Sequence, residues 1–249
     1  ITEINKGGWE WSNADAMQLY AWYTGLVYLT PLIGGMIADR LTGFRKAILL
    51  GALIMTLGHA SMALEMVNPT FFYIGLAFMI FGNGLFKPNI SSMVGNLYPD
   101  TSSKKDAGYT IFYMGINAGA FLGMLLCGYI GEKIGWHYGF GLAGVFMLFG
   151  MLQFYFGSKI FGVIGERPKK QIPTDLEKVE EDVKEEETPA HIVRDRLVVV
   201  GVLMVASIFF FFAFEQAGGS MTVFAKDYTQ RVLEGNAGTM FKWVDAILT

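Results

Sequence analysis

Charged residues are scarce in this chain of 249 residues. Asp, Glu, Lys and Arg make up 16% of it, against about 25% in soluble globular domains. Hydrophobic residues make up 53%, and the mean hydropathy is +0.40. A net charge of −3, with no basic stripe between aromatic residues, excludes a nucleic-acid-binding surface. This composition indicates an integral membrane protein.

Cysteine and histidine are also scarce. The single Cys127 lies in an apolar run, so we interpret it as a small buried thiol and exclude a disulfide framework. The three histidines have no metal-ligand spacing: His59, His137 and His191. No nucleophile–base set is present. We therefore expect no metal, no cofactor and no enzymatic activity.

The chain lacks an initiator methionine and a signal peptide. It opens on a polar segment, ITEINKGGWEWSN, and at Ala246–Thr249 a further apolar helix begins. We expect it to be a fragment of a longer protein.

Long apolar runs are abundant. Apolar windows of 18 or more residues can span the hydrocarbon core of a bilayer. They predict six membrane helices, at Asp15–Ala38, Phe44–Leu64, Thr70–Val94, Tyr109–Ile130, Tyr138–Phe161 and Leu197–Phe224. Asp15 after Asn13 is the candidate N-cap of the first helix, and Pro69 that of the third.

One connection, Gly162–Arg196, is long and charged. We interpret it as a solvated linker. Within it Leu176, Val179 and Val183 recur at helical spacing, so a short amphipathic helix on the membrane surface is an alternative. Lys and Arg concentrate in this linker and in the loops after the first and third spans. This bias predicts that all three lie in the cytoplasm and that the opening segment lies outside.

One charge lies deep in each of two spans. Lys87 is about two-thirds of the way along Phe71–Met93, and Glu215 lies within Val198–Thr222. A charge at the centre of a membrane helix costs roughly 2.5–3.5 kcal/mol on translocon scales. Lys87 must therefore face a wet cavity or a counter-charge, and the two residues together suggest a polar cavity. A purely structural ion pair is the alternative for each.

Polar side chains also share helix faces. Tyr20, Thr24 and Tyr28 are spaced four apart, as are Tyr113 and Asn117. A buried Asn117 amide can pair with a peptide bond as donor and acceptor, or form a structural bond between helices. The tyrosines can bind substrate, or pack within the bundle or at the membrane interface.

Glycines spaced by four lie in the same span as Asn117. Gly115, Gly119 and Gly123 form small-xxx-small repeats, which we interpret as a helix-packing site. They are not a phosphate loop, because no strand or P-loop lysine accompanies them.

The loop between the first two spans carries a spaced motif. Its residues are Gly35, Asp39, Arg40, Gly43 and Arg45. Glycine permits close helix approach, and Asp39 can cap a neighbouring helix or pair with a loop arginine. The pattern resembles the loop motif of the major facilitator superfamily, which implies an all-α bundle of membrane helices.

Further stretches resemble the proton-coupled oligopeptide transporter family of this superfamily. They are GGMIADRLTGFRKAILLGALIMTLG (Gly34–Gly58), GNGLFKPNISSMVGNLY (Gly82–Tyr98), FYMGINAGAF (Phe112–Phe121) and FEQAGGSM (Phe214–Met221). The resemblance runs from that family's second helix to the start of its eighth. It implies an N-terminal bundle in residues 1–161, an inter-bundle linker in 162–196 and the start of a C-terminal bundle in 197–249.

The resemblance also implies roles by position. Lys87 matches the lysine that pairs with first-helix glutamates and takes part in peptide and proton coupling. Glu215 matches the acid that pairs with a first-helix arginine and is linked to proton movement. Tyr28, Tyr113 and Asn117 match peptide-binding residues.

Three departures from the family pattern are visible. Phe211 stands where the family commonly has a tryptophan of the binding site, so the usual indole contact is not provided. Ala21 stands where animal members have a histidine, so proton transfer through that imidazole is not available. The first-helix E-x-x-E-R motif is not in the chain.

The resemblance implies a function. It is import of di- and tripeptides with protons by alternating access, by a functional monomer in the plasma (bacterial inner) membrane. Two alternatives stay open. The same fold could carry nitrate or another small anion, or the protein could be a non-transporting membrane receptor or scaffold.

Overall fold

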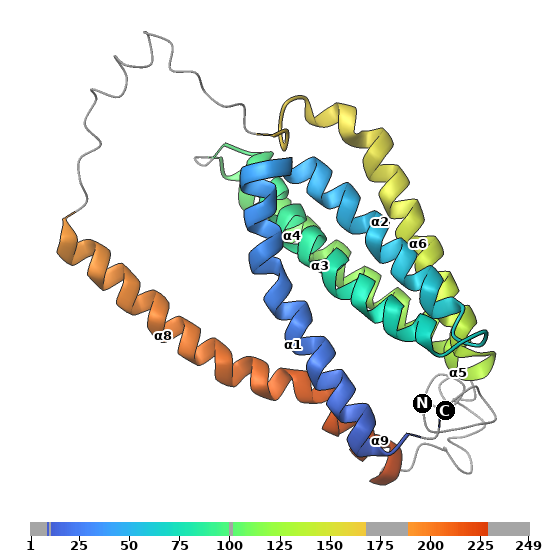
Figure 1. The fold of residues 1–249 in the computed structure, drawn as a ribbon. Coiled ribbons are helices and arrows are strands. Elements are labelled where there is room, and N and C mark those ends of the chain that lie inside the picture. Colours follow the sequence, from blue (N-terminus) through green and yellow to red (C-terminus); the bar gives the residue numbers. More distant parts are fainter. Residues whose placement is uncertain (1–8, 10, 100–101, 168–188, 229–249) are drawn as a thin grey trace, which may run out of the picture. The chain divides into compact units, whose positions relative to one another are not determined.

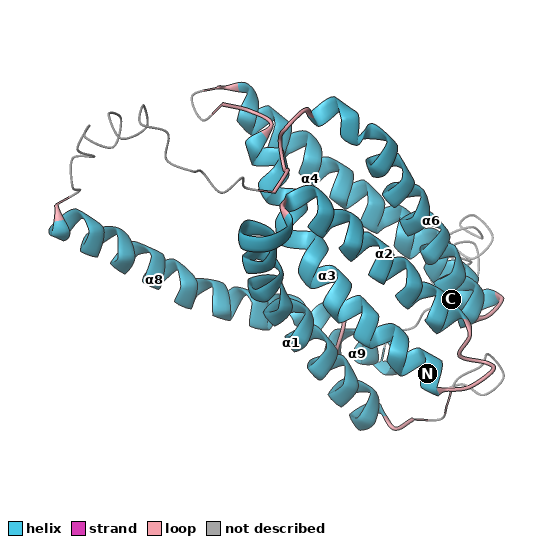
Figure 2. Cartoon of the chain, turned by 45° about the horizontal axis from the view of Figure 1, so that its top comes forward, coloured by secondary structure: helices cyan, strands magenta, loops and turns pink. Residues whose placement is uncertain are grey.

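The structure is a computed structural model that describes residues 9, 11–99, 102–167 and 189–228. These residues form helices joined by short turns, without a strand among them (Figure 1, Figure 2). The elements are α1 (Asn13–Ile37), η2 (Ala38–Thr42), α2 (Phe44–Ala63), α3 (Thr70–Asn96), α4 (Lys104–Gly123), η3 (Met124–Gly128), α5 (Tyr129–Lys133), α6 (Trp136–Gly157), η4 (Ser158–Phe161), α8 (Ala190–Phe214), η5 (Glu215–Ala217) and α9 (Ser220–Tyr228).

All six predicted membrane helices are confirmed. The spans that are long and apolar enough to cross a bilayer are Asn13–Thr42, Phe44–Ala63, Thr70–Asn96, Lys104–Lys133, Trp136–Phe161 and Ala190–Ala225. The last helix begins at Ala190, well before the predicted Leu197, because the charged residues before the apolar run form its first turns. The surface helix considered for Leu176–Val183 lies outside the described residues.

The predicted N-cap of the first helix is wrong. Ser12 is the cap, and its hydroxyl accepts a hydrogen bond from the backbone N–H of Asp15 at 3.1 Å. Asn13 and Asp15 lie inside the first turn, where a carboxylate interacts favourably with the helix dipole. Pro69 is confirmed as the N-cap residue of α3, and the Asn68 side chain accepts from the first N–H of that helix at 2.8 Å.

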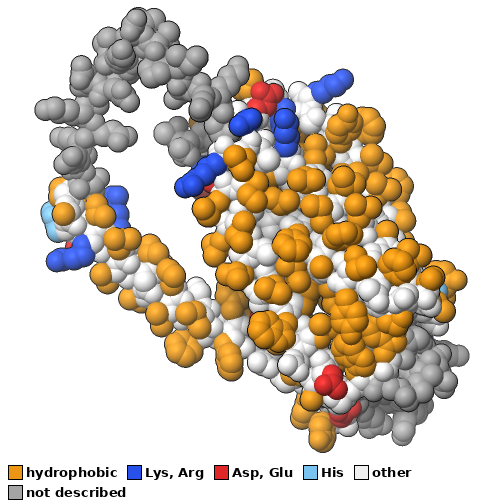
Figure 3. All heavy atoms as spheres, viewed as in Figure 1, with side chains coloured by type: hydrophobic (Ala, Val, Ile, Leu, Met, Phe, Trp, Pro, Cys, Tyr) orange, Lys and Arg blue, Asp and Glu red, His pale blue; other side chains and the backbone are white. Residues whose placement is uncertain are grey.

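The helices fall into two compact units, divided between Pro168 and Lys169. The first unit contains α1 to α6, and the second contains α8, η5 and α9. Many hydrophobic side chains lie exposed on the face of the first unit that Figure 3 shows. Its visible Lys and Arg side chains gather at the end where α1 gives way to α2. An apolar side with a basic end is typical of a bundle in a bilayer.

Glycines let the helices of the first unit approach closely. A Cβ atom added to Gly51 of α2 would lie 2.7 Å from the carbonyl oxygen of Gly82 on α3. One added to Gly34 of α1 would collide with the carbonyl of Gly84 on α3. Both contacts depend on the missing side chain, as is usual where membrane helices pack through small residues.

The packing site predicted at Gly115, Gly119 and Gly123 is not formed within the described part of the chain. No described atom lies within 4 Å of a Cβ placed at any of the three. The helix that carries them, α4, has no buried residue. Close packing occurs instead along α1, α2 and α3.

The chain that leaves α6 is held against the start of α2. The Arg45 guanidinium donates to the carbonyl of Gly162, and the Arg45 backbone N–H donates to the carbonyl of Gly165 at 2.9 Å. Arg45 Nη1 also lies 3.8 Å from the Glu166 carboxylate, and the guanidinium carbon lies 5.8 Å from the centroid of the Phe161 ring. Arg45 thereby fixes the backbone of the segment 162–166.

Gly34→Ala should destabilise the protein, because the new Cβ would collide with the Gly84 carbonyl. Overpacking of this kind costs about 1–3 kcal/mol. We expect the Tm of the purified full-length protein in detergent to fall by roughly 3–10 °C. The control is Gly25→Ala on the same helix, where no described atom lies within 4 Å of the added Cβ. An unchanged Tm for Gly34→Ala would contradict the close contact.

Arg45→Gln should release the segment after α6, because it removes the guanidinium contacts to Gly162 and Glu166. A hydrogen bond to a charged group contributes about 1.5–3 kcal/mol. We therefore expect a glutamate-specific protease to cut after Glu166 at least tenfold faster, as measured by mass spectrometry of the fragments. Arg40→Gln is the matched control, since the exposed Arg40 side chain has no partner among the described residues. Equal cleavage of the two variants would refute this role.

Candidate functional site

Lys87 lies deep in α3. At a rise of 1.5 Å per residue, it is about 14 Å from the end of the helix at Asn96. The hydrocarbon core of a bilayer is about 30 Å thick, so this position is inside it when α3 spans the membrane. Its side chain is exposed on the surface of the first unit.

The structure brings two predicted site residues together. Lys87 Nζ lies over the ring of Tyr28 on α1, 5.1 Å from the ring centroid. A cation–π contact contributes about 0.5–1 kcal/mol at exposed sites and about 2 kcal/mol when desolvated. This is less than the roughly 2.5–3.5 kcal/mol that a charge costs at a helix centre. The ring alone therefore does not compensate the charge.

Lys87 needs a further partner. Within the described part of the chain, no carboxylate lies within 4 Å of its ammonium group. Tyr28 is also open to the surroundings, with 45% of its surface exposed. A cation and an aromatic ring thus lie side by side on an exposed part of the first unit.

Polar side chains join the two helices that carry this pair. The bonds are Thr30 Oγ1 to the Ile80 carbonyl at 2.9 Å, Asn83 Nδ2 to the Val27 carbonyl at 3.3 Å and Asn89 Nδ2 to the Gly34 carbonyl at 3.3 Å. Sequence reasoning assigned no role to these side chains. Their signal was available, because polar residues inside apolar spans need partners.

Tyr113 and Asn117 lie on α4 and are exposed. The Asn117 side-chain amide donates to the carbonyl of Tyr113 at 2.9 Å, and the Tyr113 ring contacts Phe112. Neither side chain contacts Lys87 or Tyr28 within the described chain. Their convergence on the lysine therefore stays a prediction.

A residue that sequence reasoning missed attaches α4 near Lys87. The Tyr109 hydroxyl donates to the carbonyl of Ser91 on α3 at 3.3 Å, and the Ser91 hydroxyl donates to the carbonyl of Lys87 at 3.2 Å. Tyr109 lies one turn before Tyr113 and continues the four-residue spacing of that face. This spacing was the signal that could have found it.

Phe211 and Glu215 lie at the end of α8, in the second unit. The Phe211 ring contacts those of Phe210 and Phe214, with centroids 5.3 and 6.3 Å away. Glu215 follows the last residue of α8, opens η5 and is half-buried. Its predicted relation to Lys87 across a shared cavity stays a prediction.

The loop motif forms η2 and the turn into α2. Its residues are Gly35, Asp39, Arg40, Gly43 and Arg45. Gly43 has φ +75°, and a Cβ there would lie 2.6 Å from the backbone of Glu166 and Arg167, so only glycine fits. The Asp39 side chain is exposed and neither caps a helix nor pairs with an arginine in the described chain.

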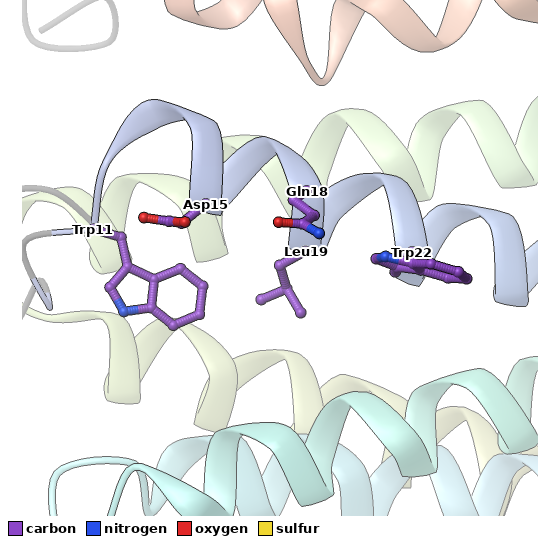
Figure 4. A pocket seen from close by; sticks show the side chains of 5 residues that line it. All are labelled: Trp11, Asp15, Gln18, Leu19 and Trp22. Atoms are coloured by element: carbon purple, nitrogen blue, oxygen red, sulfur yellow. The ribbon is translucent and has the colours of Figure 1, made fainter.

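A hollow of about 400 Å³ lies beside the start of α1. Its lining residues are Trp11, Asp15, Gln18, Leu19 and Trp22 (Figure 4). The last four share one side of the helix, so a carboxylate, an amide and an indole follow one another along α1. No predicted site residue lines this hollow. The described residues contain no group of three or more His, Cys, Asp or Glu side chains that could hold a metal ion.

Known proteins resemble this chain in sequence. Residues 45–180 match the sequence model of the POT family. A di-/tripeptide transporter of Lactococcus lactis subsp. cremoris is 38% identical over 169 residues, which cover 68% of this chain and 34% of that protein. The uncharacterized transporter YclF of Bacillus subtilis is 40% identical over 153 residues, which cover 61% of this chain and 31% of that protein.

Solved structures resemble it as well. A crystal structure of a peptide transporter POT in complex with sulfate has a TM-score of 0.64 and 36% identity, covering 83% of this chain and 40% of that one. A POT family transporter in complex with a thioalcohol-conjugated peptide has a TM-score of 0.61 and 32% identity, covering 83% of this chain and 41% of that one.

The chain spans about a third of the length of the curated relatives it matches. The predicted all-α membrane bundle of the major facilitator superfamily is confirmed. The match to the family model extends over more than half of the chain, which therefore belongs to the POT family.

Proposed function

We propose that the protein is a proton-coupled symporter that imports di- and tripeptides by alternating access. Membership of the POT family and the similarity to a di-/tripeptide transporter support this substrate class. The observation that carries the proposal is the Lys87 ammonium of α3 beside the Tyr28 ring of α1, 5.1 Å from the ring centroid. A cation next to an aromatic wall suits the carboxylate of a short peptide and the side chain beside it.

Lys87 and Glu215 carry the proton coupling in this proposal. They exchange partners as a proton and a zwitterionic peptide arrive, so that neither charge is left alone in the membrane. The other site residues contact the peptide backbone and side chains: Tyr28, Tyr113, Asn117 and Phe211. Hydroxyl and amide groups suit a peptide bond because they donate and accept hydrogen bonds.

The membrane potential supplies the driving force. One elementary charge that moves inward across 100 mV releases about 2.3 kcal/mol. This is sufficient for roughly fifty-fold accumulation of a peptide that enters with one proton. Two helix bundles rock about the central site and open it to each side in turn.

We assign the protein to the plasma (bacterial inner) membrane, where it acts as a monomer. Residues 1–161 belong to the N-terminal bundle, 162–196 to a cytoplasmic linker and 197–249 to the start of the C-terminal bundle. The Lys and Arg side chains at one end of the first unit support this orientation (Figure 3).

Lys87→Ala should abolish accumulation of a dipeptide in proteoliposomes under an imposed pH gradient and membrane potential. The ratio of internal to external peptide should fall from roughly fifty-fold to about one, because the group that couples peptide to protons is gone. Lys104→Ala, which removes an exposed lysine at the start of α4, is the control and should accumulate normally. Coupling through Lys87 is refuted if its alanine variant still concentrates peptide.

The same vesicles separate the alternatives. Unlabelled dipeptide should displace labelled dipeptide, and nitrate should not. Competition by nitrate would favour an anion carrier. Absence of both uptake and thermal stabilisation by peptides would favour a non-transporting receptor or scaffold.

The Tyr28 ring should contribute to peptide binding separately from its hydroxyl. Tyr28→Phe keeps the ring beside Lys87, whereas Tyr28→Leu removes it. Because an exposed cation–π contact contributes about 0.5–1 kcal/mol, the KM for dipeptide should be about two- to fivefold higher for the leucine variant than for the phenylalanine variant. Equal KM values would show that the ring does not position the ammonium group.

A further inference from the structure

Each of the two helices that form the candidate site contains an internal proline. Pro31 lies in α1, three residues after Tyr28, and Pro88 lies in α3, directly after Lys87. Proline has no backbone N–H, so the carbonyl four residues earlier loses its usual helical donor. The carbonyls concerned are those of Val27 and Gly84.

The structure supplies a donor for the carbonyl that Pro31 frees. Asn83 on α3 donates from Nδ2 to the Val27 carbonyl at 3.3 Å. The carbonyl that Pro88 frees, on Gly84, faces the backbone of Gly34, which is possible because Gly34 has no side chain. The carbonyl freed by each proline thus contacts a residue of the other helix.

The Asn83 bond and the Lys87 contact occupy the same stretch of the interface. Asn83 and Lys87 are one turn apart on the same face of α3. Val27 and Tyr28 are consecutive in α1. A bond from Asn83 to Val27 therefore sets the position of the backbone that carries the Tyr28 ring, relative to the helix that carries the ammonium group.

We propose that Asn83 is a positioning residue of the transport site, which holds the proline break of α1 so that the Tyr28 ring stays over Lys87. This proposal rests on the proposed function. An amide suits the role because its NH₂ group donates to a carbonyl, and a carbonyl without a partner is strongly disfavoured in the membrane. Asn83 touches no substrate and acts through Tyr28.

The test is a double-mutant cycle between Asn83 and Pro31 in the full-length protein, with the KM for dipeptide uptake as the readout. Asn83→Ala should raise KM about fivefold with little change in kcat, as expected for loss of one hydrogen bond that orders the binding site. Pro31→Ala restores the N–H that bonds the Val27 carbonyl within α1. In that background Asn83→Ala should change KM less than about twofold, because the Val27 carbonyl already has a backbone donor and no longer depends on the Asn83 amide.

Asn89→Ala is the matched control. Asn89 also donates from α3 to a carbonyl of α1, that of Gly34, but the backbone N–H of Ala38 bonds this carbonyl as well. Its effect on KM should therefore be the same factor in both backgrounds. An effect of Asn83→Ala that persists in full beside Pro31→Ala, or no effect at all, would overturn the proposal.

Two outcomes need a second readout. If Asn83→Ala does not accumulate in the membrane, recovery of its expression by Pro31→Ala supports the proposal, and failure to recover overturns it. If the wild-type protein takes up no peptide, the proposed function fails. The Tm of the same four variants in detergent then tests the hydrogen bond by itself. The fall in Tm caused by Asn83→Ala must be smaller in the Pro31→Ala background, and an equal fall in both backgrounds would refute the bond.

Discussion

No water is available in the hydrocarbon core of a membrane to bond a free backbone carbonyl, so the protein must repair any break in a membrane helix itself. The helices α1 and α3 contain one such break each, at Pro31 and Pro88. At the Pro31 break the Asn83 side chain supplies a donor to the Val27 carbonyl. At the Pro88 break the Gly84 carbonyl lies against the backbone of Gly34, which is possible only because Gly34 has no side chain. The contact between Tyr28 and Lys87 follows from this approach, because both residues adjoin the two breaks.

The second constraint is the charge of Lys87. A cation–π contact offsets only part of the free energy that a charge loses at the centre of a membrane helix. Water or an anion has to supply the rest of the stabilising free energy. A site that holds a cation without compensating it fully binds an anionic group strongly, and it releases that group when an acidic side chain takes its place. An incompletely compensated charge is therefore suited to a transporter, which must bind and release its cargo in each cycle.

The sequence predicts the helices of this fold well, because length and hydropathy decide which segments span a membrane. The sequence does not decide contacts that depend on where a second helix or a neighbouring side chain lies. The glycine spacing at Gly115 predicts packing, but the described chain places no helix there. Ser12, Asn13 and Asp15 all lie near the start of α1 and could cap it, and only the backbone geometry selects Ser12. The Tyr28–Lys87 contact depends on where two helices cross, so neither segment alone predicts it.

The contacts of Arg45 extend the same reasoning to the end of the first unit. Arg45 and Gly43 hold the backbone of residues 162–167 at the start of α2. The helix α2 packs through glycines on α3, which in turn packs on α1. The segment after α6 is thus connected to the proline-containing helices through a continuous series of close backbone contacts. The two units divide just beyond this segment, at Pro168, so the chain leaves the first unit from a segment that contacts with Arg45 hold in place. In the proposed transport cycle a bundle that rocks about a central site needs a firmly held exit, since a loosely held one would absorb the movement that the site must transmit.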